Sequence, residues 1–239
     1  MAETLTIVLD GRELSARPGQ TILAAADEAG VWIPRLCHKG GLEPYGGCRV
    51  CVVKANGRPV AACTQPVSPG LVVESDTPEL TEQRRILVEL LFVEGNHFCM
   101  SCEKSGNCEL QALAYRLGIA APRFEYLFPA RALDASHPDI LLDRNRCVLC
   151  ARCVRSSREL DRKQVFGFAG RGAGRRIVAD AANGLAGTQA HSDDHALDAC
   201  PVGALVRKRV GFAVPVGARL YDQLPIGSGS TAAAPAEKP

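Results

Sequence analysis

The sequence predicts an α+β fold of three small domains, each arranged around its own group of cysteines. The first observation behind this prediction is that residues 1–78 read as several short strands around a single helix, which is an α+β arrangement. The second is that the eleven cysteines fall into three groups, within residues 37–63, 99–108 and 147–200. We therefore predict domains over residues 1–78, 79–137 and 138–210, followed by a C-terminal extension over 211–239.

The first domain shows clear strand and turn signals. Residues 4–9 alternate like a strand, Asp10 and Gly11 are typical of a hairpin turn, and residues 13–16 predict the second strand. A helix is expected over residues 21–29 and ends at Gly30. Further strands are predicted over residues 50–54, 60–63 and 71–74, with an Asn-Gly turn at 56–57 between the first two.

The second domain is predicted to open with a long helix. Thr77 is a suitable N-cap and Pro78 suits the first helical position. The apolar face of this helix is expected to consist of Ile86, Leu87, Leu90, Leu91 and Val93. A short helix is predicted over residues 109–117, and strands of the third domain over 164–168 and 176–179. The tail from about residue 227 has low sequence complexity and is expected to be disordered.

Composition excludes several classes of function. The net charge of +2 makes no electrostatic case for binding nucleic acid. The most apolar stretch, residues 86–93, is too short to span a bilayer, and the N-terminus lacks the pattern of a secretory signal. We therefore expect a cytoplasmic protein, where thiols stay reduced. Eleven cysteines in that compartment indicate metal ligands rather than disulfides.

The first cysteine group has the spacing C-x10-C-x2-C-x11-C, from Cys37 through Cys48 and Cys51 to Cys63. Two close cysteines and two distant ones are typical of a [2Fe–2S] centre in a ferredoxin-like domain. The glycines at residues 46–47 permit the turns that bring backbone N–H groups near the sulfurs. The alternative is a structural zinc site, which usually has two C-x2-C pairs rather than one.

The third cysteine group combines a C-x2-C-x2-C run with a remote C-P pair. This pattern is typical of a [4Fe–4S] cluster in bacterial-type ferredoxins. The run consists of Cys147, Cys150 and Cys153, and the remote pair is Cys200 with Pro201. In two-cluster ferredoxins the remote cysteine serves the other cluster, but this sequence has no second run. We therefore expect Cys200 to complete the same cluster.

The middle group supplies only three thiolates, from Cys99, Cys102 and Cys108. A [4Fe–4S] cluster needs a fourth ligand, and His97 is the nearest candidate. A neutral imidazole in place of a thiolate removes one negative charge and should raise the reduction potential, as in Rieske centres. The alternatives are a cluster with an open iron position and a zinc site built from the same four residues.

Basic residues are concentrated around the third group, where they either form a solvated helix face or compensate the charge of a cluster. They are Arg144, Arg146, Arg152, Arg155, Arg158, Arg162 and Lys163. No phosphate-binding loop, dinucleotide fingerprint or hydrolase signature occurs in the chain. We therefore expect no catalytic residues and no site for flavin or NAD here.

Four motifs carry a resemblance to a known family. They are P-x2-C at residues 34–37, G-C-R-V-C at 47–51, E-G-N-H-x-C-x2-C-E-K-S-G-x-C-x-L-Q at 94–111 and C-P-V-G at 200–203. The chain resembles the N-terminal region of the 75 kDa-type subunit of complex I. It is still more similar to the small diaphorase subunits of soluble NAD-reducing [NiFe]-hydrogenases, because its histidine lies two residues before Cys99. In complex I that histidine usually lies four residues before, where this chain has Gly95.

This resemblance implies a β-grasp [2Fe–2S] domain, a small His/Cys [4Fe–4S] domain and a bacterial-ferredoxin-like [4Fe–4S] domain. The implied ligand sets are Cys37, Cys48, Cys51 and Cys63; His97, Cys99, Cys102 and Cys108; and Cys147, Cys150, Cys153 and Cys200. The implied role is that of a non-catalytic electron-transfer subunit of an oxidoreductase. Its partners would be a diaphorase subunit that carries FMN and binds NAD, and the small and large [NiFe]-hydrogenase subunits.

Two alternatives remain open. The same relay could serve an NAD-dependent formate dehydrogenase or a complex I-like NADH dehydrogenase. A function of another class would be a zinc-stapled structural protein.

Overall fold

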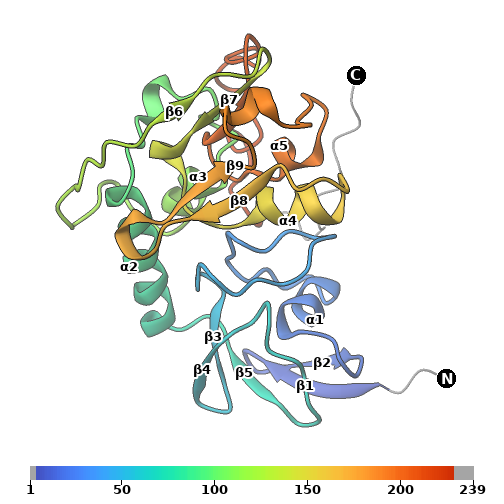
Figure 1. The fold of residues 1–239 in the computed structure, drawn as a ribbon. Helices are drawn as coiled ribbons and strands as arrows, with labels where there is room; N and C mark the ends of the chain where they lie inside the picture. The colour runs from blue at the N-terminus through green and yellow to red at the C-terminus, as the bar shows by residue number, and fades with distance from the viewer. Residues whose placement is uncertain (1–3, 229–239) are drawn as a thin grey trace.

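The computed structural model describes residues 4–228 of the chain. Its N-terminal domain holds a five-stranded sheet in the order β2–β1–β5–β3–β4, and helix α1 (Ile22–Glu28) shares a buried core with this sheet. The strands are Leu5–Leu9 (β1), Arg12–Ala16 (β2), Val52–Ala55 (β3), Arg58–Ala61 (β4) and Val72–Glu74 (β5). β1 and β5 run parallel, and the other neighbours run antiparallel. This arrangement confirms the predicted ferredoxin-like domain (Figure 1).

Both hairpins of this sheet have the turn residues that their geometry needs. Asp10 and Gly11 both have positive φ, and so do Asn56 and Gly57. A two-residue turn with two positive φ angles is the type I′ turn that suits the twist of antiparallel strands. Helix α1 ends at Glu28, and Gly30, whose φ is +72°, turns the chain into the loop that carries Cys37.

Helix α2 (Pro78–Val93) begins where it was predicted, with the Thr77 hydroxyl accepting a hydrogen bond from the Leu80 N–H. Its predicted apolar face is confirmed only for Val93 and for Leu91, which packs against the core. Val93 is buried, whereas Leu90 is exposed and Ile86, Leu87 and Leu91 are half-buried. The buried positions are Leu80, Arg84, Val88, Glu89 and Val93. Arg84 and Glu89 take inward positions because each has partners there. Arg84 donates to backbone carbonyl oxygens, and Glu89 pairs with Arg123.

The remaining domains combine short helices with small sheets. The helices are Glu109–Arg116 (α3), Arg152–Glu159 (α4) and His195–Ala199 (α5), with a 3-10 turn at Cys99–Ser101. A three-stranded antiparallel sheet has the order β10–β7–β6, from Leu205–Arg207 (β10), Ile140–Asp143 (β7) and Leu133–Asp134 (β6). A separate hairpin joins Phe166–Ala169 (β8) to Arg176–Ala179 (β9). The α+β class is therefore confirmed across the described residues.

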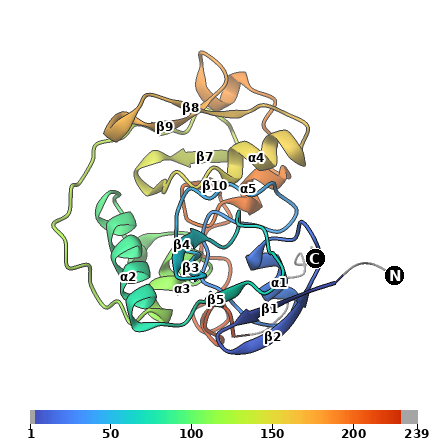
Figure 2. The same cartoon turned by 90° about the horizontal axis from the view of Figure 1, so that it is seen from below.

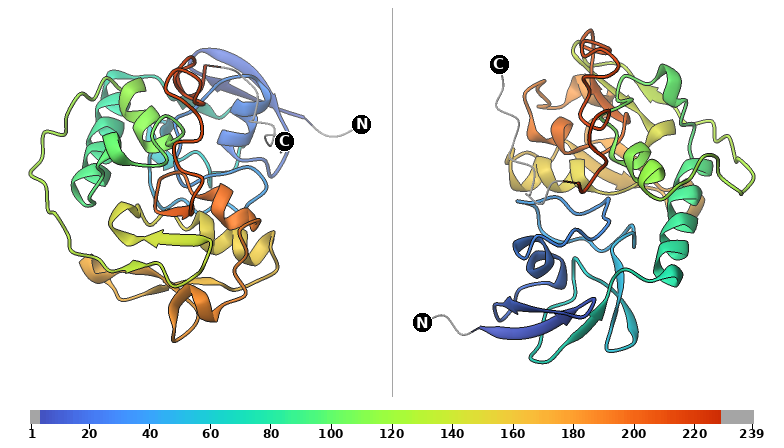
Figure 3. Two further views of the ribbon diagram at one scale, coloured as in Figure 1. Left: turned by 90° about the horizontal axis from the view of Figure 1, so that it is seen from above. Right: turned by 180° about the vertical axis from the view of Figure 1, so that it is seen from behind.

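The domains pack closely, and several segments cross between them. Helix α4 lies directly above the loop that follows α1 (Figure 1). The segment 117–132 between α3 and β6 runs along the outside of the molecule (Figure 2). The segment after residue 210 returns across the molecule toward the N-terminal domain (Figure 3), where Gly227 lies against the Trp32 ring. Nearly all of the tail predicted to be disordered lies outside the described residues.

Among residues 4–228, no helix is both long and apolar enough to cross a membrane.

Candidate functional site

The first cysteine group meets beside the N-terminal sheet. Hydrogen bonds from the Cys48 and Cys63 thiols hold the pKa of Cys37 far below its ordinary value. A hydrogen bond from Cys63 lowers the pKa of Cys51 to about 7. All four sulfurs of this group are thus linked by direct contacts. The backbone N–H of Cys37 also donates to the Cys48 Sγ at 3.3 Å.

The third cysteine group surrounds one cavity with an apolar lining. Cys147, Cys150, Cys153 and Cys200 all line it, together with side chains such as Leu142 and Ile177. Burial raises the pKa of Cys147 to about 11 and of Cys150 to about 12. Four thiols around one cavity match the donor set of a cubane cluster, whose metal ions deprotonate them on binding. The structure therefore brings Cys200 to the same site as the C-x2-C-x2-C run.

The loops between these cysteines adopt backbone conformations that are unusual for residues with a side chain. Arg49, Leu149 and Ala151 have φ of 61°, 52° and 59°, and each lies between two cysteines of its site. Such left-handed conformations cost of order 1–2 kcal/mol in non-glycine residues. They turn backbone N–H groups toward sulfur: the Leu149 N–H approaches Cys147, and the Arg152 N–H approaches Cys150. The strained loops thus favour the charged, ligating form of the thiols.

The middle group also lines a single cavity, which contains His97, Cys99, Cys102 and Cys108. The His97 Nε2 atom is buried and has no hydrogen-bond partner, while the Leu91 backbone interacts with the ring. Burial lowers the pKa of His97 to about 4, so the imidazole is neutral at pH 7. A histidine that ligates a metal is neutral, offers one ring nitrogen to the metal and typically donates from the other nitrogen to a backbone or carboxylate oxygen. His97 has these features.

Gly95 explains the unusual position of this histidine. A Cβ atom at residue 95 would lie 2.6 Å from the His97 Nε2 atom and 2.8 Å from the Asn145 carbonyl oxygen. The His97 ring therefore occupies the space that a side chain at residue 95 would enter. Glycine at 95 makes room for a ring that enters the site from two residues further along the chain.

No group of three or more His, Cys, Asp or Glu side chains within residues 4–228 lies close enough to hold a single metal ion. The fit of the sites to clusters rests instead on the two cavities, the linked thiols of the first group and the free nitrogen of His97. All twelve residues predicted as ligands lie at one of the three sites.

The third site contacts the first site through α4. Arg155 donates to the carbonyl oxygen of Cys37 at 2.5 Å and also to that of Glu43. The Glu43 N–H in turn donates to the Glu159 carboxylate at the end of α4 at 2.9 Å. These contacts fix the loop of the first site directly on the helix that begins inside the third site.

The third site contacts the middle site through Pro201, which follows Cys200, and through Arg146. The Glu109 N–H donates to the Pro201 carbonyl oxygen at 2.9 Å. Arg146, which precedes Cys147, approaches the Cys102 Sγ at 3.6 Å. The third site therefore has contacts with both of the other sites.

Gly203 of the C-P-V-G motif lines the cavity of the middle site. A Cβ atom at this residue would lie 2.6 Å from the Cys102 Sγ. We expect Gly203→Ala to displace Cys102 and to alter the electron paramagnetic resonance signal of the middle cluster. The signal of the third cluster should change little, although Gly203 follows Cys200 closely in sequence. The reverse pattern would contradict this placement, and Gly167→Ala, with no atom near its Cβ position, provides a control.

Sequence reasoning missed a set of buried arginines that hold the cluster loops. Arg84 on α2 donates to the carbonyl oxygens of Val50 at 3.2 Å and Val52 at 2.7 Å, on both sides of Cys51. Within the basic group around the third site, Arg152 and Arg155 are buried, whereas Arg158 and Arg162 are exposed. The only available signal was that positive charges lie beside the cysteine motifs.

Three family models match consecutive parts of the chain. A 2Fe-2S iron–sulfur cluster binding domain matches residues 2–78, and the NADH-ubiquinone oxidoreductase-G iron–sulfur binding region matches residues 84–123. The ferredoxin-like domain of NADH-quinone oxidoreductase subunit 3 matches residues 137–206. These matches confirm the predicted set of one [2Fe–2S] and two [4Fe–4S] clusters.

Similar proteins of known identity agree with these models. The chain is 44% identical over 222 residues to the gamma subunit of the NAD-reducing hydrogenase HoxS of Cupriavidus necator, covering 92% of this chain and 94% of that protein. It is 34% identical to the NADH-ubiquinone oxidoreductase 78 kDa subunit of Candida albicans, but covers only 29% of that protein. A crystal structure of NAD⁺-reducing [NiFe]-hydrogenase in the H2-reduced state contains a chain with TM-score 0.91 and 48% identity, covering 94% of this chain and 96% of that one.

Proposed function

The chain belongs to the family of iron–sulfur subunits that includes the gamma subunit of NAD-reducing hydrogenase, and from this premise we propose that it relays electrons between a [NiFe]-hydrogenase module and a flavin- and NAD-binding partner. When bound, the clusters supply one-electron transfer, and the chain itself provides no catalytic group. The observation that carries the proposal is the packing of three cysteine sites against one another. Because the third site contacts each of the other two, electrons have a continuous path through one chain.

The contacts between the sites support a defined order. The third site packs on the loop of the first through Arg155 and on the middle site through Glu109 and Arg146. We therefore place the ligand set Cys147, Cys150, Cys153 and Cys200 in the centre. The set Cys37, Cys48, Cys51 and Cys63 lies at one end, and the set His97, Cys99, Cys102 and Cys108 lies at the other. In this order the [2Fe–2S] site is part of the route and not a side store.

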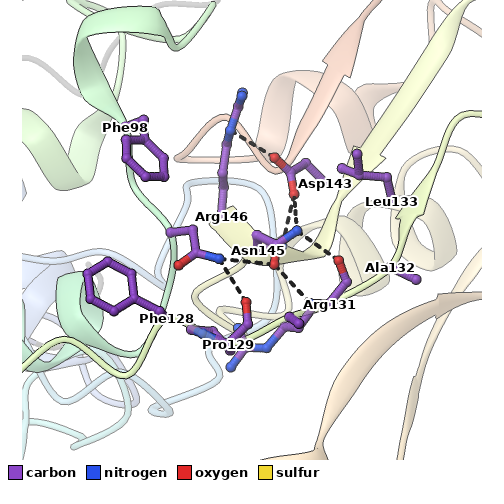
Figure 4. A pocket seen from close by; sticks show the side chains of 11 residues that line it. Phe98, Phe128, Pro129, Arg131, Ala132, Leu133, Asp143, Asn145 and Arg146 are labelled. Carbon is purple, nitrogen blue, oxygen red and sulfur yellow. Dashed lines mark hydrogen bonds and ion pairs between the residues drawn. The ribbon is translucent and has the colours of Figure 1, made fainter.

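The end of the route at the middle site carries a surface suited to docking a redox partner. Phe98 and Phe128 are 66% exposed, and Met100 is 99% exposed. Both phenylalanines line an open cavity of about 630 Å³ (Figure 4). Its wall is braced by Asn145, which donates to the Arg131 carbonyl oxygen at 2.8 Å. Phenylalanine and methionine are enriched at the centres of protein interfaces, so this exposed apolar surface is suited to a partner protein.

We expect the double variant Phe98→Glu/Met100→Glu to release one redox partner from the complex. Loss of two apolar anchors should cost about 2 kcal/mol or more, which is roughly 30-fold in Kd. Co-purification of the hydrogenase module and of the flavin-binding partner with the tagged variant measures this loss and identifies which of them binds here. Val216→Glu, at a residue that is 82% exposed, is the matched control. Unchanged recovery of both modules would contradict the placement.

The alternative role, as a relay in a complex I-like enzyme, rests on the similarity to subunits that are much longer than this chain. The chain covers about a quarter to a third of such subunits, whereas it covers 94% of the hydrogenase gamma subunit. The identity of 44% to the hydrogenase subunit, against 34%, 33% and 30% to these longer subunits, supports the hydrogenase assignment over the complex I alternative. We also propose a cytoplasmic location and the domain boundaries given by the cysteine groups.

Purification of the native complex under anaerobic conditions tests this function. The proposal predicts a brown preparation in which this chain carries about ten iron and about ten sulfide atoms, from one [2Fe–2S] and two [4Fe–4S] clusters. A [NiFe] large subunit and a flavin subunit should co-purify. A colourless, zinc-containing chain would contradict the proposal, and a molybdopterin subunit in place of the hydrogenase would transfer the relay to another enzyme.

A further inference from the structure

Arg152 lies at the point where the three cysteine sites meet. Its side chain is 2% exposed, and its guanidinium makes a bidentate ion pair with Glu109, at 2.5 Å to Oε1 and 2.7 Å to Oε2. It also donates to the carbonyl oxygens of His38 at 2.6 Å and Ala199 at 3.5 Å. A fully buried arginine is costly unless such partners satisfy it.

Each of these contacts is made next to a predicted cluster ligand. Glu109 follows Cys108 of the middle site, and His38 follows Cys37 of the first site. Ala199 precedes Cys200 of the third site, and Arg152 itself lies between Cys150 and Cys153. One guanidinium therefore joins the loops of all three sites, whose cysteines lie far apart in sequence.

The other buried arginines within residues 4–228 do not combine these features. Arg84 and Arg155 donate to backbone carbonyl oxygens around the first site alone. Arg152 instead pairs with the carboxylate of Glu109, which begins α3 directly after Cys108 of the middle site. The pair thus presents a positive group to the third site and a negative group to the middle site.

We propose that the Arg152–Glu109 pair is a shared positioning element that sets the reduction potentials of the third and middle clusters relative to each other. The inference rests on the proposed function, because it concerns clusters held by the ligand sets given above. Each cluster gains a negative charge on reduction, so a nearby cation favours the reduced form and a nearby anion opposes it. Arg152 is buried and the Glu109 side chain is 24% exposed, so the charges of the pair are less screened than charges on the open surface.

Two single variants should shift the potentials in opposite directions. Glu109→Gln keeps the shape of the side chain but removes the negative charge next to Cys108, so we expect higher midpoint potentials, with the larger rise in the middle cluster. Arg152→Met removes the positive charge between Cys150 and Cys153 and leaves Glu109 unpaired, so we expect lower potentials, with the larger fall in the third cluster. The double variant Arg152→Met/Glu109→Gln removes both charges and should return the potentials toward those of the wild type.

The test is a redox titration of the purified holo-complex, followed by electron paramagnetic resonance. Glu89→Gln is the matched control, because Glu89 is likewise paired bidentately with an arginine, but its partner Arg123 is not next to a cysteine in the sequence. Should Arg152→Met fail to assemble, the isosteric Glu109→Gln variant still decides the outcome. The inference fails if Glu109→Gln leaves the potentials or the difference between the two clusters unchanged, or if both single variants shift the potentials the same way. If the wild type lacks three cluster signals, the proposed function itself fails.

Discussion

Replacing Cys200 by alanine is expected to stop hydrogen-driven NAD⁺ reduction by the assembled enzyme. Cys200 lines the cavity of the third site together with the three cysteines of the C-x2-C-x2-C run. Loss of even an outer partner of a metal ligand costs about 10–100-fold in metal affinity or activity, so loss of the ligand should cost at least about 100-fold. Because we place this site at the centre of the route, no electrons should bypass it.

Two activities measured on the same preparation separate this effect from general damage. Hydrogen-driven NAD⁺ reduction needs the complete route, whereas NADH-driven dye reduction needs only the flavin partner. We expect the first to be lost in Cys200→Ala and the second to remain. His191→Ala, at an exposed residue of the same segment, is the control and should retain both. Substantial hydrogen-driven activity in Cys200→Ala would mean that the third site is not central.

Replacing His97 by cysteine should lower the midpoint potential of the middle cluster. Burial lowers the pKa of His97 to about 4, so the wild-type ligand is neutral at pH 7, whereas a ligating cysteine carries a negative charge. The effect of histidine ligation in Rieske centres suggests a shift on the order of 100 mV or more. His97→Ala should instead alter or abolish the signal of this cluster.

A redox titration monitored by electron paramagnetic resonance measures both variants. The signals of the first and third clusters serve as internal controls, since their predicted ligands are untouched. If all three signals and their potentials stay unchanged in both variants, His97 is not a ligand.

The sequence predicted the parts of the molecule that depend on local chemistry. The turns at Asp10–Gly11 and Asn56–Gly57 need residues that tolerate positive φ, and the structure has both turns where they were predicted. The cysteine spacing likewise predicted which residues would meet, including the remote Cys200, because a cubane cluster needs four donors. Thr77 and Pro78 marked the start of α2 for the same local reason.

The parts that depend on distant contacts could not be predicted in this way. Arg84 takes an inward position on α2 because carbonyl oxygens of the Cys51 loop and of Ser75 accept its hydrogen bonds. Glu89 is buried because Arg123, which lies beyond α3, pairs with it. Periodicity assigns charged residues to the solvated face of a helix, so it placed Leu90 inside instead. The contact of Gly203 with Cys102 depends on the same kind of long-range packing.

The spin–spin interactions between the reduced clusters test the central claim most directly. The claim is that three sites form one route, with the set Cys147, Cys150, Cys153 and Cys200 between the other two. In the fully reduced holo-complex, electron paramagnetic resonance should show the third cluster coupled to each of the others, and Cys200→Ala should remove both couplings. Coupling between the first and middle clusters that persists at full strength in Cys200→Ala would contradict the account.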